Sequence, residues 1–191
     1  MEFIVPGRGR RPLPAVFAAV LMLLVVVLAG CGKDDSVNEP HEAFANVEVD
    51  YARAIRASTA EVTGSELVSL ELTRPESADP VWVSRVATQQ GEVHTVRVDA
   101  VLGDVLGTST AGTGTDGLTA AELTARLDEA TVLPDEAARE ARGSTDGPVT
   151  AIRLDQQGDT VVWAVDVAGL QGEETKTHVV DARTGEVLRR G

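Results

Sequence analysis

The sequence predicts a fold of helices and antiparallel strands, in which a unit of one helix followed by three or four strands occurs twice. The main observation is an internal repeat: residues 81–87 recur as 162–168, and residues 98–106 recur as 180–188. Alternating apolar and polar residues in both copies predict strands, and apolar spacings of three and four predict helices. Each copy has only roughly 60 residues, so we expect the copies to pack on each other or on a partner.

A different signal predicts the helix of each copy. In the first copy, apolar residues recur at spacings of three and four between Phe44 and Ile55, which marks one buried face. In the second copy, Pro134 precedes Asp135 and Glu136; proline suits a first helical turn, and carboxylates favour the positive end of the helix dipole.

Strands are predicted after each helix. In the first strand of each copy, one face is expected to hold alternating residues: Val68, Leu70 and Leu72 in copy one, and Thr150, Ile152 and Leu154 in copy two. Residues 161–167 alternate in the same way. Residues 157–159 and 181–186 are predicted hairpin turns, the second with Gly185 at positive φ.

The copies are joined by a stretch rich in Gly, Ser and Thr. Residues 108–117 contain no large apolar residue and are predicted to be a flexible linker. A further helix is predicted directly afterwards, because Thr119 and Glu122 can form a capping box and Leu118 can pack on Leu123.

The amino-terminal segment predicts export from the cytoplasm. Three arginines within residues 8–11 precede an uncharged apolar run over residues 15–30. As a helix this run would span about 24 Å, short of the roughly 30 Å hydrocarbon core, so it suits a signal peptide better than a permanent membrane span. The run ends in Leu28-Ala29-Gly30-Cys31, which holds the only cysteine of the chain.

This quartet resembles the lipobox of bacterial lipoproteins. The resemblance implies that residues 1–30 are a signal peptide, removed after a lipid with acyl chains such as palmitate is attached to Cys31. The alternatives are an uncleaved anchor and a chance cysteine. Cleavage would remove three Arg and one Glu, which changes the formal charge from −13 to −15. Residues 31–42 would then be a flexible tether to the outer face of the cell membrane.

The repeat resembles a PepSY domain present twice. The second copy matches in its acidic, alanine-rich helix at 135–141, its strand around Trp163 and its closing Val-Asp-Ala-Arg-Thr-Gly-Glu-Val at 180–187. The first copy keeps Asp99 but has Val-Leu where the turn usually holds a polar pair. The resemblance implies an α+β fold of two units, residues 43–107 and 118–191, each a helix packed on a small antiparallel sheet. It also implies a non-catalytic role, as in the propeptides of secreted metallopeptidases.

Composition argues against several kinds of chemistry. One cysteine excludes an internal disulfide framework and a zinc site of several thiolates. The acidic balance, 30 Asp and Glu against 17 Lys and Arg, argues against nucleic-acid binding. The chain has no Gly-x-Ser-x-Gly motif, and His41, His94 and His178 do not have metal-ligand spacing. We therefore expect neither an enzyme nor a bound metal or cofactor.

Four residues are candidate binding residues because both copies keep them: Trp82, Trp163, Asp99 and Asp181. Each has a structural alternative. The tryptophans can be core anchors, and the aspartates can accept backbone hydrogen bonds at a hairpin.

These observations lead to two hypotheses of function. We expect a membrane-anchored, extracytoplasmic binding module of the bacterial cell envelope, which regulates a secreted or envelope peptidase by non-covalent occlusion through a sheet face or edge. The alternative is a cell-surface binder or sensor of a small cationic ligand or metal ion, which would use the negative charge of the chain. Exposed apolar residues near a tryptophan would favour the first hypothesis, and carboxylates clustered on one face the second.

Overall fold

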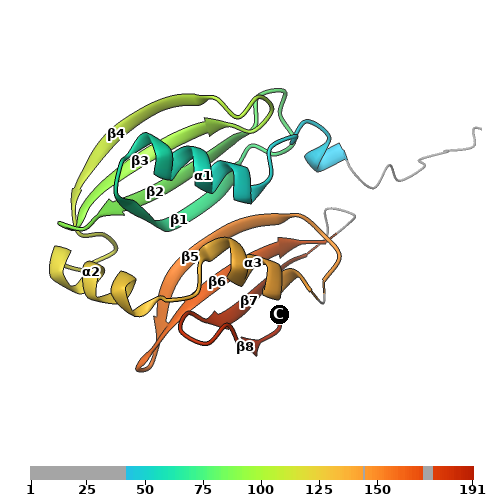
Figure 1. Cartoon of the computed structure of the whole chain (residues 1–191). Coiled ribbons are helices and arrows are strands. Elements are labelled where there is room, and N and C mark those ends of the chain that lie inside the picture. Colours follow the sequence, from blue (N-terminus) through green and yellow to red (C-terminus); the bar gives the residue numbers. More distant parts are fainter. Residues whose placement is uncertain (1–41, 144, 170–173) are drawn as a thin grey trace, which may run out of the picture. The chain divides into compact units, whose positions relative to one another are not determined.

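Eight strands form one antiparallel sheet in the order β4-β3-β2-β1-β5-β6-β7-β8 (Figure 1). The structure is a computed structural model that describes residues 42–143, 145–169 and 174–191. The strands are β1 (Ser65–Thr73), β2 (Val81–Thr88), β3 (Glu92–Asp99), β4 (Val105–Thr113), β5 (Val149–Gln157), β6 (Thr160–Ala168), β7 (Thr175–Asp181) and β8 (Val187–Arg189).

The predicted fold of two units, each with its own small sheet, is therefore wrong. The first strands of the two halves, β1 and β5, pair with each other at Ser69↔Arg153, Leu70↔Ile152 and Glu71↔Ala151. Without this pairing each half would expose a free strand edge, and the two edges satisfy their backbone groups by joining. The repeat in the sequence indicates two similar segments, but it carries no signal for which edges meet.

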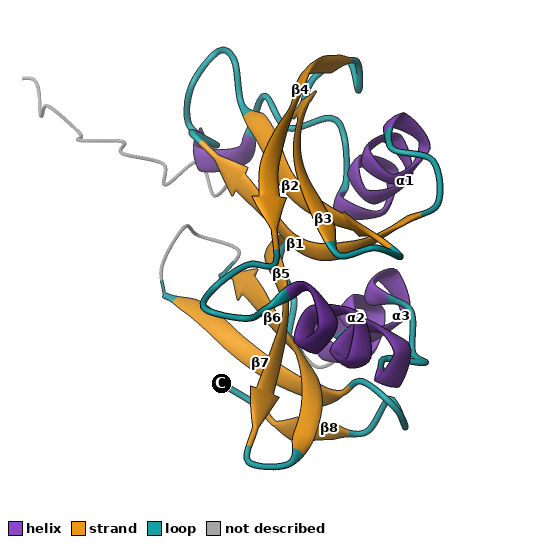
Figure 2. Ribbon diagram, turned by 90° about the vertical axis from the view of Figure 1, so that its left-hand side faces the viewer, coloured by secondary structure: helices purple, strands orange, loops and turns teal. Residues whose placement is uncertain are grey.

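Helices α1 (Tyr51–Glu61) and α3 (Pro134–Arg142) lie on the same side of the sheet (Figure 2). The helix predicted from residue 44 begins only at Tyr51, because the Asp50 carboxylate accepts a hydrogen bond of 2.8 Å from the Arg53 amide and caps the helix there. Phe44 instead ends a short 3-10 helix, η1 (Glu42–Phe44). Within the part of the chain that the structure describes, no helix is long and apolar enough to cross a membrane.

The main core lies between these two helices and the sheet. It contains Trp82, Trp163 and the alternating residues of β6, which confirms the alternation predicted for 161–167. The prediction for β1 fails at Val68. A register irregularity between Leu67 and Ser69 places Leu67 in the main core and Val68 in a second cluster on the other face.

Helix α2 (Ala120–Glu129) confirms the further helix predicted after the linker. Thr119 and Glu122 form both hydrogen bonds of the capping box. The second cluster joins α2 to the sheet and consists of Val68, Ala87, Val93, Leu123 and Leu127, with Leu118 and Leu154 packed against it. Because side chains alternate along a strand, Ala87 points away from Val86 of the main core, so α2 packs against the face opposite to α1.

The predicted linker is largely a strand. Residues 108–113 belong to β4, which pairs with β3 at the outer edge of the sheet. All nine residues of β4 are exposed. Because neither face of this strand is buried, its sequence lacks the alternation of apolar and polar residues that predicts a strand. Hydrogen bonding to β3, which cannot be inferred from composition, makes this segment a strand.

Candidate functional site

The two candidate tryptophans lie in the core. Trp82 is 1% exposed and Trp163 is 2% exposed. Each indole N–H donates to the backbone segment that leads into the helix of its half: Trp82 Nε1 to the Val49 carbonyl at 2.7 Å, and Trp163 Nε1 to the Val132 carbonyl at 2.9 Å. Neither ring is available at the surface, so both anchor a helix to the sheet.

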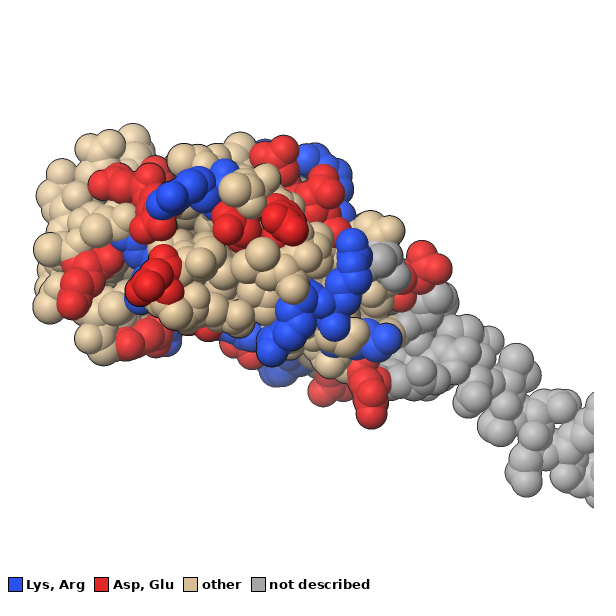
Figure 3. Space-filling model, turned by 90° about the horizontal axis from the view of Figure 1, so that it is seen from below, with Lys and Arg blue, Asp and Glu red and all other residues tan. Residues whose placement is uncertain are grey.

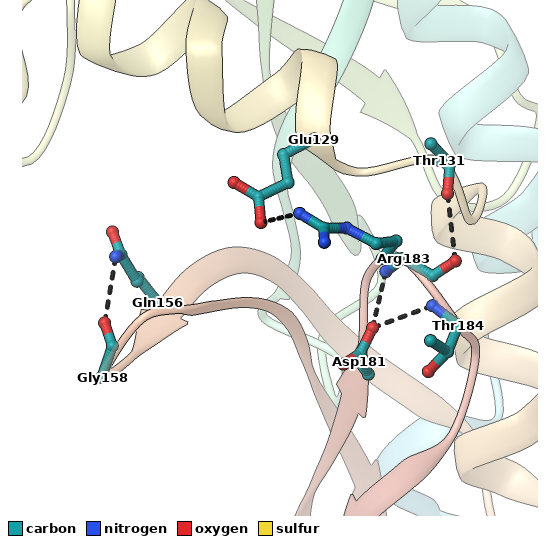
Figure 4. A network of polar contacts seen from close by, with 7 residues as sticks. All are labelled: Glu129, Thr131, Gln156, Gly158, Asp181, Arg183 and Thr184. Carbon is teal, nitrogen blue, oxygen red and sulfur yellow. Dashed lines mark hydrogen bonds and ion pairs between the residues drawn. The ribbon is translucent and has the colours of Figure 1, made fainter.

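The two candidate aspartates organise turns. Asp99 Oδ1 accepts hydrogen bonds from the amides of Val101 and Leu102, at 2.7 and 3.0 Å. Asp181 Oδ1 accepts from the amides of Arg183 and Thr184, both at 2.8 Å (Figure 4). The hydrogen bond from the Thr184 amide is the main reason why the pKa of Asp181 lies below its ordinary value.

A second set of contacts ties the turn after Asp181 to the end of α2. The Arg183 guanidinium donates to the Glu129 carboxylate, and Thr131 Oγ1 donates to the Arg183 carbonyl at 3.0 Å (Figure 4). The turn is therefore stabilised by Asp181 of β7 and by Glu129 and Thr131 at the end of α2. The matching turn of the first half has Val101 and Leu102 in place of Arg183 and Thr184.

The histidines and carboxylates of the described part of the chain do not gather into a metal site. Within residues 42–143, 145–169 and 174–191, no group of three or more His, Cys, Asp or Glu could hold a metal ion. The face shown in Figure 3 carries acidic side chains and a group of basic side chains. Cys31, the lipobox residues 28–30 and His41 lie outside the described residues, and cation binding stays a prediction.

A cavity of about 600 Å³ lies beside α2 and the β1–β5 pairing. Three arginines line it, and each has an acceptor within the chain. Arg85 pairs with Asp116 at 3.1 Å, Arg153 pairs with Asp166 at 2.9 Å, and Arg126 donates to the Gln156 side chain at 2.9 Å. These contacts connect α2, the loop before it and the sheet.

The two outer edges of the sheet differ strongly. The edge formed by β4 is nine residues long, is exposed along its whole length and contains no charged residue and no proline. The opposite edge, β8, has three residues and pairs irregularly with β7. An edge strand presents unpaired backbone N–H and C=O groups, and proteins usually protect it by short length, charge, proline or a bulge. β4 has only the last of these, since its register with β3 shifts near each end and is regular over residues 107–110.

Exposed apolar side chains gather where β4 begins. The described residues include five exposed large apolar residues, and three of them lie here: Leu102, Val105 and Leu106, at 62%, 36% and 50% exposure. Together with β4 they form what we call the β4 edge, residues 102–113. The sequence marks only the start of this edge, because Val105 and Leu106 recur as Val187 and Leu188 after the matching turn. The rest of β4 has no apolar pattern that would indicate a strand or a site.

Comparison with known proteins establishes no family. No protein-family model and no curated protein matches the chain. Two solved structures resemble it: CD1622, a candidate lipoprotein of Clostridium difficile 630, with 20% identity and a TM-score of 0.48, and YpmB of Bacillus subtilis, with 18% identity and a TM-score of 0.30. The matches cover 78% and 72% of this chain, and 96% and 93% of the other chains. At these scores neither match establishes a shared family or function.

Proposed function

We propose that this protein is a binding module, without catalytic activity, that binds an extended segment of a partner protein along the β4 edge. The observation that carries the proposal is the nine-residue, uncharged and fully exposed edge strand. A partner segment added as a further strand would bond to the outward-facing backbone groups of β4, which supply affinity with little regard to sequence.

Specificity would come from the apolar end of the edge. Leu102, Val105 and Leu106 lie at the start of β4, so one end of a bound segment would meet apolar side chains. The other end would meet Gly112 and Thr113. Burial of apolar surface contributes about 25 cal/mol per Å² removed from water. We therefore expect a partner segment with large apolar residues at one end only.

The proposed location is the outer face of the bacterial cell membrane, through a lipid on Cys31. The lipobox resemblance supports this location, and the PepSY resemblance supports an envelope peptidase as the partner. Binding would act by occlusion, because a segment held against β4 is not free to enter another protein's active site. No covalent bond is made or broken in this mechanism.

The first test uses the full-length protein in living cells, with a photocrosslinking amino acid at Ser109 in the middle of β4. A matched probe at Glu71, an exposed residue on a central strand, is the control. We expect one defined partner, other than the chain itself, to be captured from Ser109 and not from Glu71. Capture of the same partner from both positions would contradict binding along the edge.

The anchor is tested with the same Ser109 probe in a Cys31→Ser background, which removes the thiol that would carry the lipid. If binding takes place at the membrane surface, capture should fall, because the chain is no longer held beside its partner. Unchanged capture would overturn the proposed location.

The decisive variant is Ser109→Lys, which places a charge in the middle of the β4 edge and blocks strand addition. Gln89→Lys adds the same charge at an exposed turn between β2 and β3 and is the matched control. We expect Ser109→Lys to abolish capture by a probe at Leu106 and Gln89→Lys to leave it unchanged. Equal capture by both variants would refute binding through this edge.

A further inference from the structure

We propose that two copies of this chain pair through their β4 strands, antiparallel and about a twofold axis at Ser109. This inference goes beyond the proposed function: it uses the same edge, and the occupant it names is a second copy of this chain. The first argument is charge. Residues 105–113 contain no charged side chain, so self-pairing places no like charges opposite each other along the strand.

The second argument is the order of side-chain sizes along β4. Ser109 is the middle residue of Val105–Thr113 and lies in the regular stretch 107–110. An axis there places Leu106 opposite Gly112, Val105 opposite Thr113, and Thr108 opposite Thr110. Large side chains meet small ones at both ends, and hydroxyl side chains meet in the middle, where cross-strand Thr pairs are favourable.

The third argument is that the assembly closes. A twofold pairing uses the same edge on both copies, so it forms a dimer, whereas growth into a longer sheet needs a second open edge. The only other outer edge of the described sheet is β8, which has three residues and includes the exposed Arg189. Two copies joined through β4 would therefore not extend into a filament.

The expected dimer is weak in dilute solution. A nine-residue strand is about 30 Å long, and pairing along it buries less than a standard protein interface. The formal charge of each copy is −13, or −15 after the proposed cleavage, so the repulsion between copies falls as salt is added. Attachment to one membrane surface would raise the effective concentration and favour pairing. Pairing also covers the edge that a partner segment would use, so the two occupants compete.

The test is cysteine crosslinking of the full-length protein in detergent, read on a non-reducing gel. Ser109→Cys places two thiols opposite each other across the proposed axis, so we expect a disulfide dimer after mild oxidation. Thr113→Cys is the matched control on the same strand, where the two thiols would lie about 27 Å apart. The parent chain controls for Cys31.

A dimer with Ser109→Cys and none with Thr113→Cys supports the pairing, and equal yields from both, or no dimer from either, overturn it. Sedimentation of the chain without added cysteines gives a second measurement. The dimer fraction should rise with salt and fall when Ser109 is replaced by Lys, whereas Gln89→Lys should not change it. Partner capture without a dimer would overturn this inference alone, and a dimer without partner capture would overturn the proposed function alone.

Discussion

The two halves of the sheet share their internal contacts and differ at their outer strands. In both halves a tryptophan N–H bonds to the segment before the helix, and the backbone carbonyl of the turn aspartate accepts a glycine amide: Asp99 from Gly103, and Asp181 from Gly185. The last strands, however, have nine residues in β4 and three in β8. Residues repeated in both halves specify the fold, and the divergent strand is where we place binding.

The halves also differ in one buried polar pair. In the first half, Ser84 donates to Ser58 at 2.6 Å between β2 and α1. In the second half, His178 is 1% exposed, and its Nε2 lies 3.2 Å from Thr145 Oγ1. The residue of β3 that matches His178 is Val96. The second half therefore has a buried titratable group where the first has an aliphatic one.

The largest expected change in stability follows from removing either tryptophan. Comparing the two variants tests whether the two halves depend equally on this residue. Trp82→Ala and Trp163→Ala should each lower the free energy of unfolding by about 3–5 kcal/mol, because each removes a buried ring and leaves a carbonyl without its donor. Urea unfolding followed by circular dichroism measures both. A loss in one variant only would show that the matching contacts are not equivalent.

The next largest effect is a pH dependence of stability, which is expected from the buried His178 of the second half and not from the matching Val96 of the first half. Burial, with the charges of Arg190 and Lys176, lowers the pKa of His178. The unfolded chain therefore binds this proton at a higher pH than the folded chain, so stability falls as the pH drops below the ordinary histidine value of about 6.5.

His178→Val should remove this dependence, which amounts to at most about 1.4 kcal/mol per pH unit for one proton. Urea unfolding of the parent and the variant near pH 7 and near pH 5 measures it, with His94→Val as the control. If the parent and His178→Val lose the same stability between these two conditions, the group does not titrate as the burial indicates.

The sequence was sufficient for features with local causes. The capping box of Thr119 and Glu122 and the turn with Gly185 depend on residues a few positions apart, and both are confirmed. The joining of β1 to β5 was not predictable, because it depends on pairing between residues as distant in the chain as Ser69 and Arg153. β4 was missed for a related reason: an edge strand exposed on both faces has no apolar pattern, and only its pairing with β3 defines it.

A smaller effect compares the two turn aspartates. Asp99→Ala and Asp181→Ala each leave two backbone amides without their acceptor, and we expect each to lower the free energy of unfolding by about 1 kcal/mol. Asn at either position keeps an acceptor oxygen and should cost less. Thermal unfolding of the four variants measures the order, and an Asn variant as unstable as its Ala counterpart would contradict it.

The smallest effect concerns the contact between the second turn and α2. Arg183→Val gives this turn the residue found in the first half, Val101, and removes the ion pair with Glu129. The pair is exposed, so its loss should cost about 0.2–1 kcal/mol and should shrink as salt screens the charges. A double-mutant cycle with Glu129→Gln isolates the coupling from the change in side-chain size. A coupling that does not weaken with salt would show that the contact between Arg183 and Glu129 does not act as an ion pair.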